Sequence, residues 1–257
     1  MKDIQNETDT RQLPINKVGV KDVKYPITVL DKQNQSQNTI GNINMYVNLP
    51  HNFRGTHMSR FIEILNKYHN RLHIDTMSDI LRDMENRLEA KEAHMEMTFP
   101  YFIEKTAPVS KIKSLMEYEC TYTGILKGDV EEFIIKVRVP ITSVCPCSKE
   151  ISDYGAHNQR SHVTIEVKMK DFIWFEDLIE IAENAASSPV YAILKRVDEK
   201  FVTEKGFDNP MFVEDIVRNI AVALNKLPAI DWYHIDSENF ESIHNHSAYA
   251  CIDSRDQ

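Results

Sequence analysis

The chain has 257 residues, a formal net charge of −9 at pH 7, 42% hydrophobic residues and 27% charged residues. These values are ordinary for a globular protein with enough apolar material for one large domain or two small ones. The acidic balance argues against general binding to nucleic acid or to a membrane surface, because such binding favours a basic face. An anionic small molecule remains compatible, since a local group of basic side chains can reverse the field inside one cleft.

Sequence patterns also limit the compartment and the class of nucleotide site. No run of about 18 apolar residues predicts a transmembrane helix, and the polar N-terminal stretch lacks the apolar core of a secretion signal. Four cysteines do not make a disulfide framework in a chain of this length. We therefore expect a cytoplasmic protein with free thiols. None of the seven glycines forms the fingerprint of a Rossmann site or a P-loop.

The first half of the chain predicts two strands, two helices and two more strands, after a flexible tail over residues 1–20. Alternating apolar residues indicate the strands, and apolar residues at positions i, i+3, i+4 and i+7 indicate the helices. In chain order, these elements are Val23–Leu30, Ile40–Leu49, Met58–Tyr68, Thr76–Leu88, Met95–Ile103 and Tyr118–Leu126.

The second half predicts the same order of elements. We expect its first helix to be broken near Ser188-Pro189. Its second helix is expected to start at Asn209-Pro210, with Asn209 as the N-cap and Pro210 at the first helical position. The elements are Glu132–Val139, His162–Met169, Trp174–Val197, Asn209–Leu227, Ile230–Ile235 and Ser247–Ile252.

These patterns predict an α+β fold made of two ββααββ modules, over residues 21–128 and 129–257. Because neither half alternates strand and helix, we expect antiparallel sheets with paired helices on one face. Each module has sheet edges that must be covered. Joining the two halves, and joining the sheet to other subunits, would cover these edges.

The stretch SVCPCSKEISDYGAHNQRS lies in a 19-residue loop from Thr142 to Arg160, between two predicted strands. Loops of this length inside a domain are usually functional or disordered. It holds Cys145, Cys147 and His157, and thiolate and imidazole are ligands that zinc and related ions prefer. A metal site, a nucleophilic cysteine and an unreactive loop all remain open from the spacing. Pro146 disfavours a disulfide between the two cysteines.

Three further stretches contain candidate functional groups. Asp198 and Glu199 are expected at the end of a helix, where the helix dipole disfavours acids and a nearby cation would offset that cost. The segment from Glu238 to His246 brings a carboxylate and two histidines together, as proton transfer near neutral pH requires. Glu214 falls in the first turn of a helix, where an acid needs no function. Solvated charge runs and polar turns are the alternatives for these stretches.

The segment GTHMSRF enters the first predicted helix with His57 and Arg60. A basic residue at a helix N-terminus suits a phosphate group, because the free backbone amides there also point at the anion. Helix starts are common, so an ordinary helix entry explains the segment as well.

The motifs TSVCPCSKEISDYGAHNQRS, LKRVDEKFVTE, NPMFVEDIVR and ENFESIHNHSAYA make the chain resemble the prokaryotic type IB GTP cyclohydrolases of the tunnelling-fold superfamily. The resemblance runs from LPINKVGVKD to ESIHNHSAYA. Val197 departs from the family pattern, which has proline at that position. The resemblance implies two ββααββ modules and a homotetramer with active sites near subunit interfaces.

Carried onto this sequence, the resemblance assigns a role to each candidate. It makes Cys145, His157 and Glu199 the ligands of one divalent metal ion (zinc, manganese or iron), with no nucleotide or organic cofactor. It makes Glu214 the anchor for guanine, and it assigns acid–base chemistry to Glu241 and His244, with His246 as a weaker candidate. Cys145 enters the catalytic set through the metal. For the triphosphate, the basic candidates are Arg60, Lys149 and Arg160.

The implied reaction is the hydrolysis of GTP to 7,8-dihydroneopterin triphosphate and formate, the first step towards tetrahydrofolate. A rival enzyme is a tunnelling-fold nitrile reductase, which uses a nucleophilic cysteine and NADPH and has no use for His157 or Glu199. The rival outside catalysis is a binding module stabilised by zinc. Chelation separates the three, because it would abolish the hydrolase, spare the reductase and unfold the module.

Overall fold

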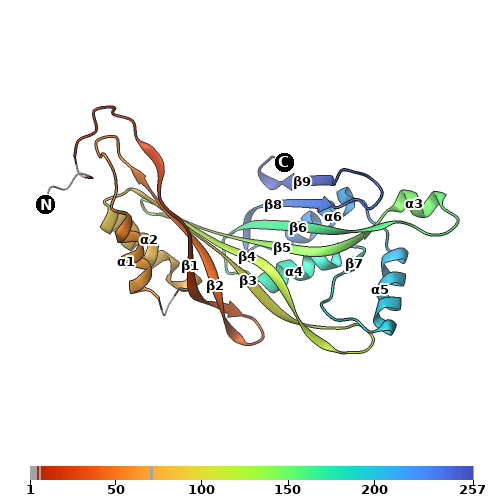
Figure 1. Ribbon diagram of the computed structural model, residues 1–257. Coiled ribbons are helices and arrows are strands. Elements are labelled where there is room, and N and C mark those ends of the chain that lie inside the picture. Colours follow the sequence, from red (N-terminus) through yellow and green to blue (C-terminus); the bar gives the residue numbers. More distant parts are fainter. Residues whose placement is uncertain (1–4, 6, 70–71, 257) are drawn as a thin grey trace. The chain divides into compact units, whose positions relative to one another are not determined.

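The structure is a computed structural model that describes residues 5, 7–69 and 72–256 (Figure 1). Its strands are β1 (Ile15–Asp31), β2 (Gln35–Leu49), β3 (Glu92–Thr106), β4 (Lys113–Lys127), β5 (Val130–Val144), β6 (Asn158–Met169), β7 (Ser188–Pro189), β8 (Ile230–Asn239) and β9 (Ala248–Asp253). Its helices are α1 (Met58–Lys67), α2 (Met77–Leu88), α3 (Pro146–Ile151), α4 (Phe175–Asn184), α5 (Arg196–Asp208) and α6 (Val213–Leu224), with 3₁₀ turns η1 (Ile74–Thr76) and η2 (Ser254–Asp256).

In the described part of the chain, nine strands form a sheet in the order β1-β2-β3-β4-β5-β6-β8-β9, with β7 paired to β5. The pairs β1–β2, β2–β3, β5–β7, β6–β8 and β8–β9 are antiparallel. The chain divides into two compact units, one holding residues up to Pro100 with Thr121–Ile134, and the other holding Tyr101–Cys120 with the residues from Ile135 onwards. Strands β3, β4 and β5 contribute residues to both units. The expected domain boundaries, 21–128 and 129–257, remain a prediction.

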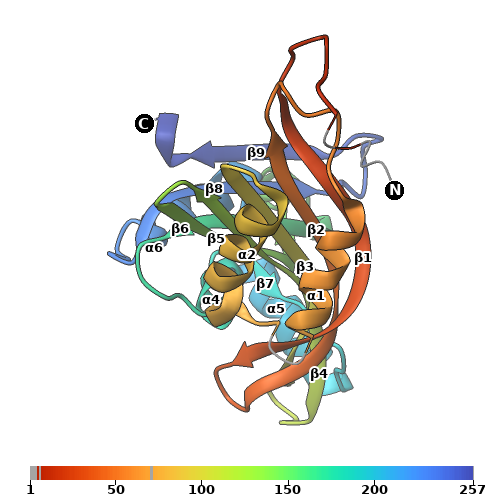
Figure 2. The ribbon, with the colours of Figure 1, turned by 90° about the vertical axis from the view of Figure 1, so that its left-hand side faces the viewer.

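In the first unit, α1 and α2 lie side by side along the sheet (Figure 2). Alternate residues of β2 are buried, as its apolar pattern requires. Helix α2 packs against β2, and α1 packs against β1. Gly124 on β4 permits close packing of α2, since a Cβ at this position would lie 2.5 Å from Cγ of Met77. The buried side chains include Ile43, Met45, Val47, Phe61, Ile64, Leu65, Ile80, Leu81 and Met84.

In the second unit, α4 and α6 contribute the buried helix faces, and α6 packs against β8 and β9. Residues 159, 161, 163, 165 and 167 of β6 are all buried, so one face of this strand points into the core. The row begins with Gln159 and Ser161 and continues with three apolar residues. Its polar start lies at the end of the strand nearest α3 (Figure 1).

The expected tandem ββααββ fold is wrong. The second half of the chain carries four helices, α3 to α6, and the two-residue strand β7, so it does not repeat the first half. Residues 146–151 form a helix inside the expected loop. Ser188 and Pro189 pair with Thr142 and Ile141 of β5, and this pairing removes them from the expected helix. The result is one nine-stranded sheet in the described residues, in place of two repeated modules.

Two expected boundaries also change. Strand β1 begins at Ile15, inside the expected tail, whose residues 1–4 and 6 lie outside the described residues. Asn209 is the C-cap of α5, and the N-cap of α6 is Phe212.

None of the helices in the described residues combines the length and hydropathy needed to cross a membrane.

Candidate active site

Cys145 is the N-cap of the short helix α3, directly after β5. Its thiol Sγ accepts a hydrogen bond from the Ser148 amide at 3.5 Å, and its own amide donates to the His157 carbonyl at 3.1 Å. The His157 amide donates to Ser148 Oγ at 3.2 Å, so these bonds hold both ends of the loop together. Cys147 is exposed, and all four cysteines are free, as the sequence predicted.

The register of β6 and β8 brings a second loop to the same place. Ser161 pairs with Asn239 in this antiparallel pair, and the Phe240 amide donates to the Arg160 carbonyl at 3.0 Å. The residues that precede β6 and those that follow β8 therefore emerge at one end of the sheet. For this reason the loop with His157 meets the turn that begins at Glu241.

The His157 ring contacts this turn through its Nδ1 atom. Nδ1 lies 3.0 Å from Gln159 Oε1, 3.4 Å from Ser242 Oγ and 4.0 Å from Glu241 Oε2. The side chains of His157 and Glu241 are only 14% and 13% exposed, so this polar contact is largely shielded from solvent. The structure thus brings an imidazole of the Cys145 loop beside a carboxylate of the acid–base turn.

The same carboxylate also approaches His244, whose Nδ1 lies 3.8 Å from Glu241 Oε2. His244 is 53% exposed and its ring stacks on that of His246 at a centroid distance of 5.2 Å. Glu241 thus faces one shielded and one exposed imidazole. This arrangement can orient a histidine that exchanges protons with a bound molecule.

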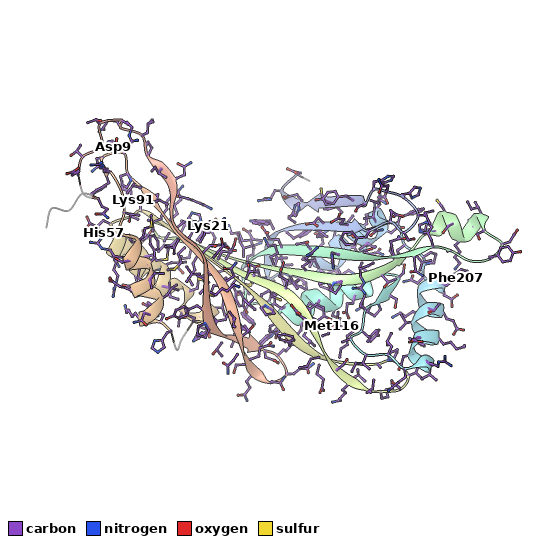
Figure 3. All side chains as sticks on the ribbon, in the orientation of Figure 1. Asp9, Lys21, His57, Lys91, Met116 and Phe207 are labelled. Atoms are coloured by element: carbon purple, nitrogen blue, oxygen red, sulfur yellow. The ribbon has the colours of Figure 1, made fainter. Side chains whose placement is uncertain are left out.

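Glu199 does not join this group. It lies exposed in the first turn of α5, so the expectation that Asp198 and Glu199 end a helix is wrong, and the helix dipole favours both acids. Lys149 of α3 donates to the Phe207 carbonyl at 2.5 Å near the other end of α5 (Figure 3). Eight residues at 1.5 Å each place Glu199 about 12 Å along the helix axis from Phe207.

Asp198 is a structural acid that the sequence showed only as part of a charge run. Its buried carboxylate accepts from the amides of Val109, Ser110 and Lys195 at 2.8, 2.8 and 2.9 Å and from Ser110 Oγ at 2.6 Å. Burial opposes ionisation, but these hydrogen bonds outweigh it and hold the pKa of Asp198 well below its usual value. Asp198 thereby ties the β3–β4 turn to the start of α5.

The remaining candidates for substrate contacts lie on separate elements. Glu214 is exposed in the first turn of α6. Arg160 is exposed on β6. Its positive charge acts on the neighbouring His162, whose pKa is lowered by burial and by the charges of Arg138 and Arg160. Arg60 belongs to the first compact unit, where its Nη1 donates to the Arg87 carbonyl at 2.6 Å.

Two residues of the loop carry atoms that are suited to bind a metal ion. Cys145 offers a thiol, and the contacts at His157 Nδ1 leave Nε2 as the nitrogen that turns away from Gln159. A ligating histidine commonly donates its other ring N–H to such an acceptor. Within residues 5, 7–69 and 72–256, however, no group of three or more His, Cys, Asp or Glu side chains is placed to hold a metal ion. Glu199 is therefore not assembled with the other two expected ligands.

Gln159, Ser143 and Asn239 were missed by sequence reasoning. Gln159 Nε2 donates to Ser143 Oγ at 2.6 Å, and Asn239 Nδ2 donates to the same oxygen at 3.1 Å. All three residues are buried. Continuing the alternation of β6 back from Val163 would have placed Gln159 on the inward face, and a polar residue at an inward position indicates a specific partner.

Comparisons with known proteins give the family. A family model described as type I GTP cyclohydrolase FolE2 matches residues 1–250. Proteins named GTP cyclohydrolase FolE2 from Geobacter sulfurreducens and Nitrosococcus oceani are 57% and 54% identical over 253 residues, which cover 98% of this chain and 98% and 95% of theirs. The resemblance to GTP cyclohydrolases is thus confirmed at the level of the type I enzymes, and the matching family carries the name FolE2 in place of type IB.

The similarity to solved structures supports the fold only, because the sequence identities are below 10%. The uricase of Arthrobacter globiformis superposes with a TM-score of 0.54 and 7% identity, covering 93% of this chain and 92% of that one. The urate oxidase of Bacillus subtilis 168 gives 0.51 and 9%, with 94% and 100% covered. These likenesses agree with a uricase-like sheet and again contradict the tandem modules. On the match over residues 1–250 and the identity to its relatives, the chain belongs to the type I GTP cyclohydrolase FolE2 family.

Proposed function

We propose that this protein is a GTP cyclohydrolase that converts GTP and water to 7,8-dihydroneopterin triphosphate and formate. This reaction is the first step of tetrahydrofolate biosynthesis. Besides family membership, one observation carries the proposal: Glu241 Oε2 lies 4.0 Å from His157 Nδ1, so the acid–base turn and the Cys145 loop meet. Assignment to type IB, a cytoplasmic location and a homotetramer with interfacial active sites belong to the same proposal.

The proposed metal ligands are Cys145, His157 and Glu199. Their donor set suits zinc, and the carboxylate also makes manganese or iron acceptable. Because Glu199 lies on α5 and away from the other two, the proposal requires movement of α5 or a second copy of the chain to complete the site. A divalent ion held there would activate water for attack on C8 of the guanine ring.

The chain's own side chains bind the substrate and move protons. Guanine presents N1–H and the exocyclic amino group on one edge, and the two carboxylate oxygens of Glu214 match these donors. Glu241 orients His244, which passes a proton to N7 as the ring opens; His246 stacks beside it. Of the basic residues assigned to the triphosphate, Lys149 and Arg60 each donate one hydrogen bond to a backbone carbonyl and keep further N–H donors for phosphate oxygens.

This proposal can be tested by measuring the turnover of GTP by metal-stripped protein. Separate samples of the stripped protein are refilled with Zn²⁺, Mn²⁺, Fe²⁺ or Mg²⁺. We expect no turnover without metal and recovery with at least one of the first three ions. Magnesium is the matched control, because it prefers oxygen ligands and disfavours a thiolate site. Full turnover by the stripped protein would exclude the metal assignment, while failure with every ion would exclude the reaction.

A further inference from the structure

A buried chain of hydrogen bonds runs from the strands to the His157 ring. Asn239 Nδ2 and Gln159 Nε2 both donate to Ser143 Oγ, at 3.1 and 2.6 Å, and Gln159 Oε1 lies 3.0 Å from His157 Nδ1. These hydrogen bonds join three neighbouring strands, β5, β6 and β8. Gln159 is only 6% exposed, so water does not replace its partners.

The donor-to-acceptor direction of these hydrogen bonds decides which ring nitrogen of His157 carries the proton. An amide has one accepting and one donating end, and a neutral imidazole likewise has one of each. With the Gln159 nitrogen donating to Ser143, the Gln159 oxygen faces Nδ1 and must accept a hydrogen bond from an N–H there. The reverse orientation would place the amide nitrogen at Nδ1 and would put the imidazole proton on Nε2.

The surroundings of Nδ1 favour the first orientation. The Glu241 carboxylate lies 4.0 Å from Nδ1, and because an ionised carboxylate can only accept hydrogen bonds, it favours an N–H at this atom. Ser242 Oγ at 3.4 Å is compatible with either direction. Every partner that the described residues offer to this ring lies at Nδ1.

We propose that Gln159 is a positioning residue that fixes His157 in the Nδ1–H tautomer and aims the lone pair of Nε2 out of the strand layer. The inference rests on the proposed function for its purpose, since a ligand nitrogen must be free of its proton. Ser143, which also accepts from Asn239, anchors the far end of the Gln159 amide, and the Glu241 carboxylate favours the orientation that points the Gln159 oxygen at Nδ1. Gln159 itself contacts neither the substrate nor the metal.

Nitrogen-15 NMR of metal-free, histidine-labelled protein at pH 8 reads the tautomer directly, without GTP or metal. The His157 signals are identified by their loss in His157→Asn. We expect the wild type to carry its proton on Nδ1, and Gln159→Met to shift the ring towards the Nε2–H form that free imidazole side chains prefer in water. Gln159→Glu should keep Nδ1–H, because a carboxylate can only accept.

Ser161→Ala is the matched control. Ser161 is the next inward residue of β6, and its buried hydroxyl has no hydrogen-bond partner among the described residues. This variant should leave the tautomer unchanged, which separates positioning from general disturbance of the strand. An Nε2–H tautomer in the wild type overturns the proposal even if no variant folds, and so does an unchanged tautomer in a folded Gln159→Met protein.

Cobalt(II) titration followed by visible absorption supplies the second readout. Loss of a hydrogen bond to a ligating histidine typically weakens metal binding by about 10–100-fold, so we expect this loss in Gln159→Met and recovery in Gln159→Glu. Equal cobalt affinity in wild type and Gln159→Met would overturn the positioning role. A tautomer shift in a protein that binds no cobalt in any form would instead count against the proposed metal site and leave the tautomer assignment standing.

Discussion

Lys105 and Glu183 form a buried ion pair whose disruption should strongly destabilise the second compact unit. Lys105 Nζ lies 2.5 Å from Glu183 Oε1, and the two side chains are 13% and 16% exposed. Nζ also donates to the Val190 carbonyl at 2.7 Å, and Tyr118 Oη donates to the same carboxylate oxygen at 2.8 Å. Burial lowers the pKa of Lys105 and outweighs the opposing effect of the Glu183 charge.

Lys105→Met keeps the apolar stem and removes the charge, leaving a shielded carboxylate with Tyr118 as its remaining partner in this cluster. Removing one member of a buried pair costs about 3–5 kcal/mol, because the other charge stays buried. For a chain of this size, such a loss lowers the melting temperature by roughly 6–20 °C. Urea unfolding followed by circular dichroism measures the change in the free energy of unfolding.

Lys200 provides the matched control. Its Nζ lies 2.7 Å from Glu204 Oε1, a similar distance, but the two side chains are 72% and 59% exposed. Lys200→Met should change the free energy of unfolding by less than about 0.5 kcal/mol. The double variant Lys105→Met/Glu183→Gln should cost less than the sum of its single changes. Equal losses in Lys105→Met and Lys200→Met would refute the reasoning from burial.

The other predictions concern the proposed site. Cys145→Ala should lose bound metal and activity while Cys147→Ala keeps its metal, as measured by elemental analysis; the opposite result would show that the wrong cysteine was assigned. His244→Ala should bind metal and GTP but turn over slower by a factor of about 10² or more, and wild-type turnover would remove it from the mechanism. Glu214→Gln should keep its melting temperature and raise KM for GTP by roughly 10-fold, since an unpaired polar group at a binding site costs about 1–3 kcal/mol; an unchanged kcat/KM would leave Glu214 as a helix-dipole acid only.

Local patterns in the sequence predicted many of the elements, because burial follows their periodicity. Ile43, Met45 and Val47 alternate inward on β2, and α1 begins at Met58 as its apolar stripe indicates. The helix expected over Trp174–Val197 ends at Asn184, and the break expected near Ser188-Pro189 is confirmed. The reason for the break is non-local. Ser188 pairs with Thr142, and Ser187 Oγ accepts from the Val144 amide at 3.1 Å, so β5 fixes this segment in an extended form.

Predicting the geometry of the candidate site requires the strand register, which local patterns in the sequence do not determine. Placing Glu241 beside His157 requires the pairing of Ser161 with Asn239, formed between residues 78 positions apart. The misplaced helix end also reversed the expected effect of the helix dipole on Glu199, because α5 starts at Arg196. Residue types alone therefore named candidate groups, whereas their meeting in space followed from the sheet.

The most direct test of the central claim is carbon-13 NMR of the wild-type protein acting on GTP labelled at C8. Hydrolytic ring opening must release that carbon, so we predict labelled formate in a one-to-one ratio with 7,8-dihydroneopterin triphosphate. Parallel samples of His244→Ala and metal-stripped protein should form both products slowly or not at all. Consumption of GTP with the label retained in the purine, or released as anything other than formate, would contradict the account.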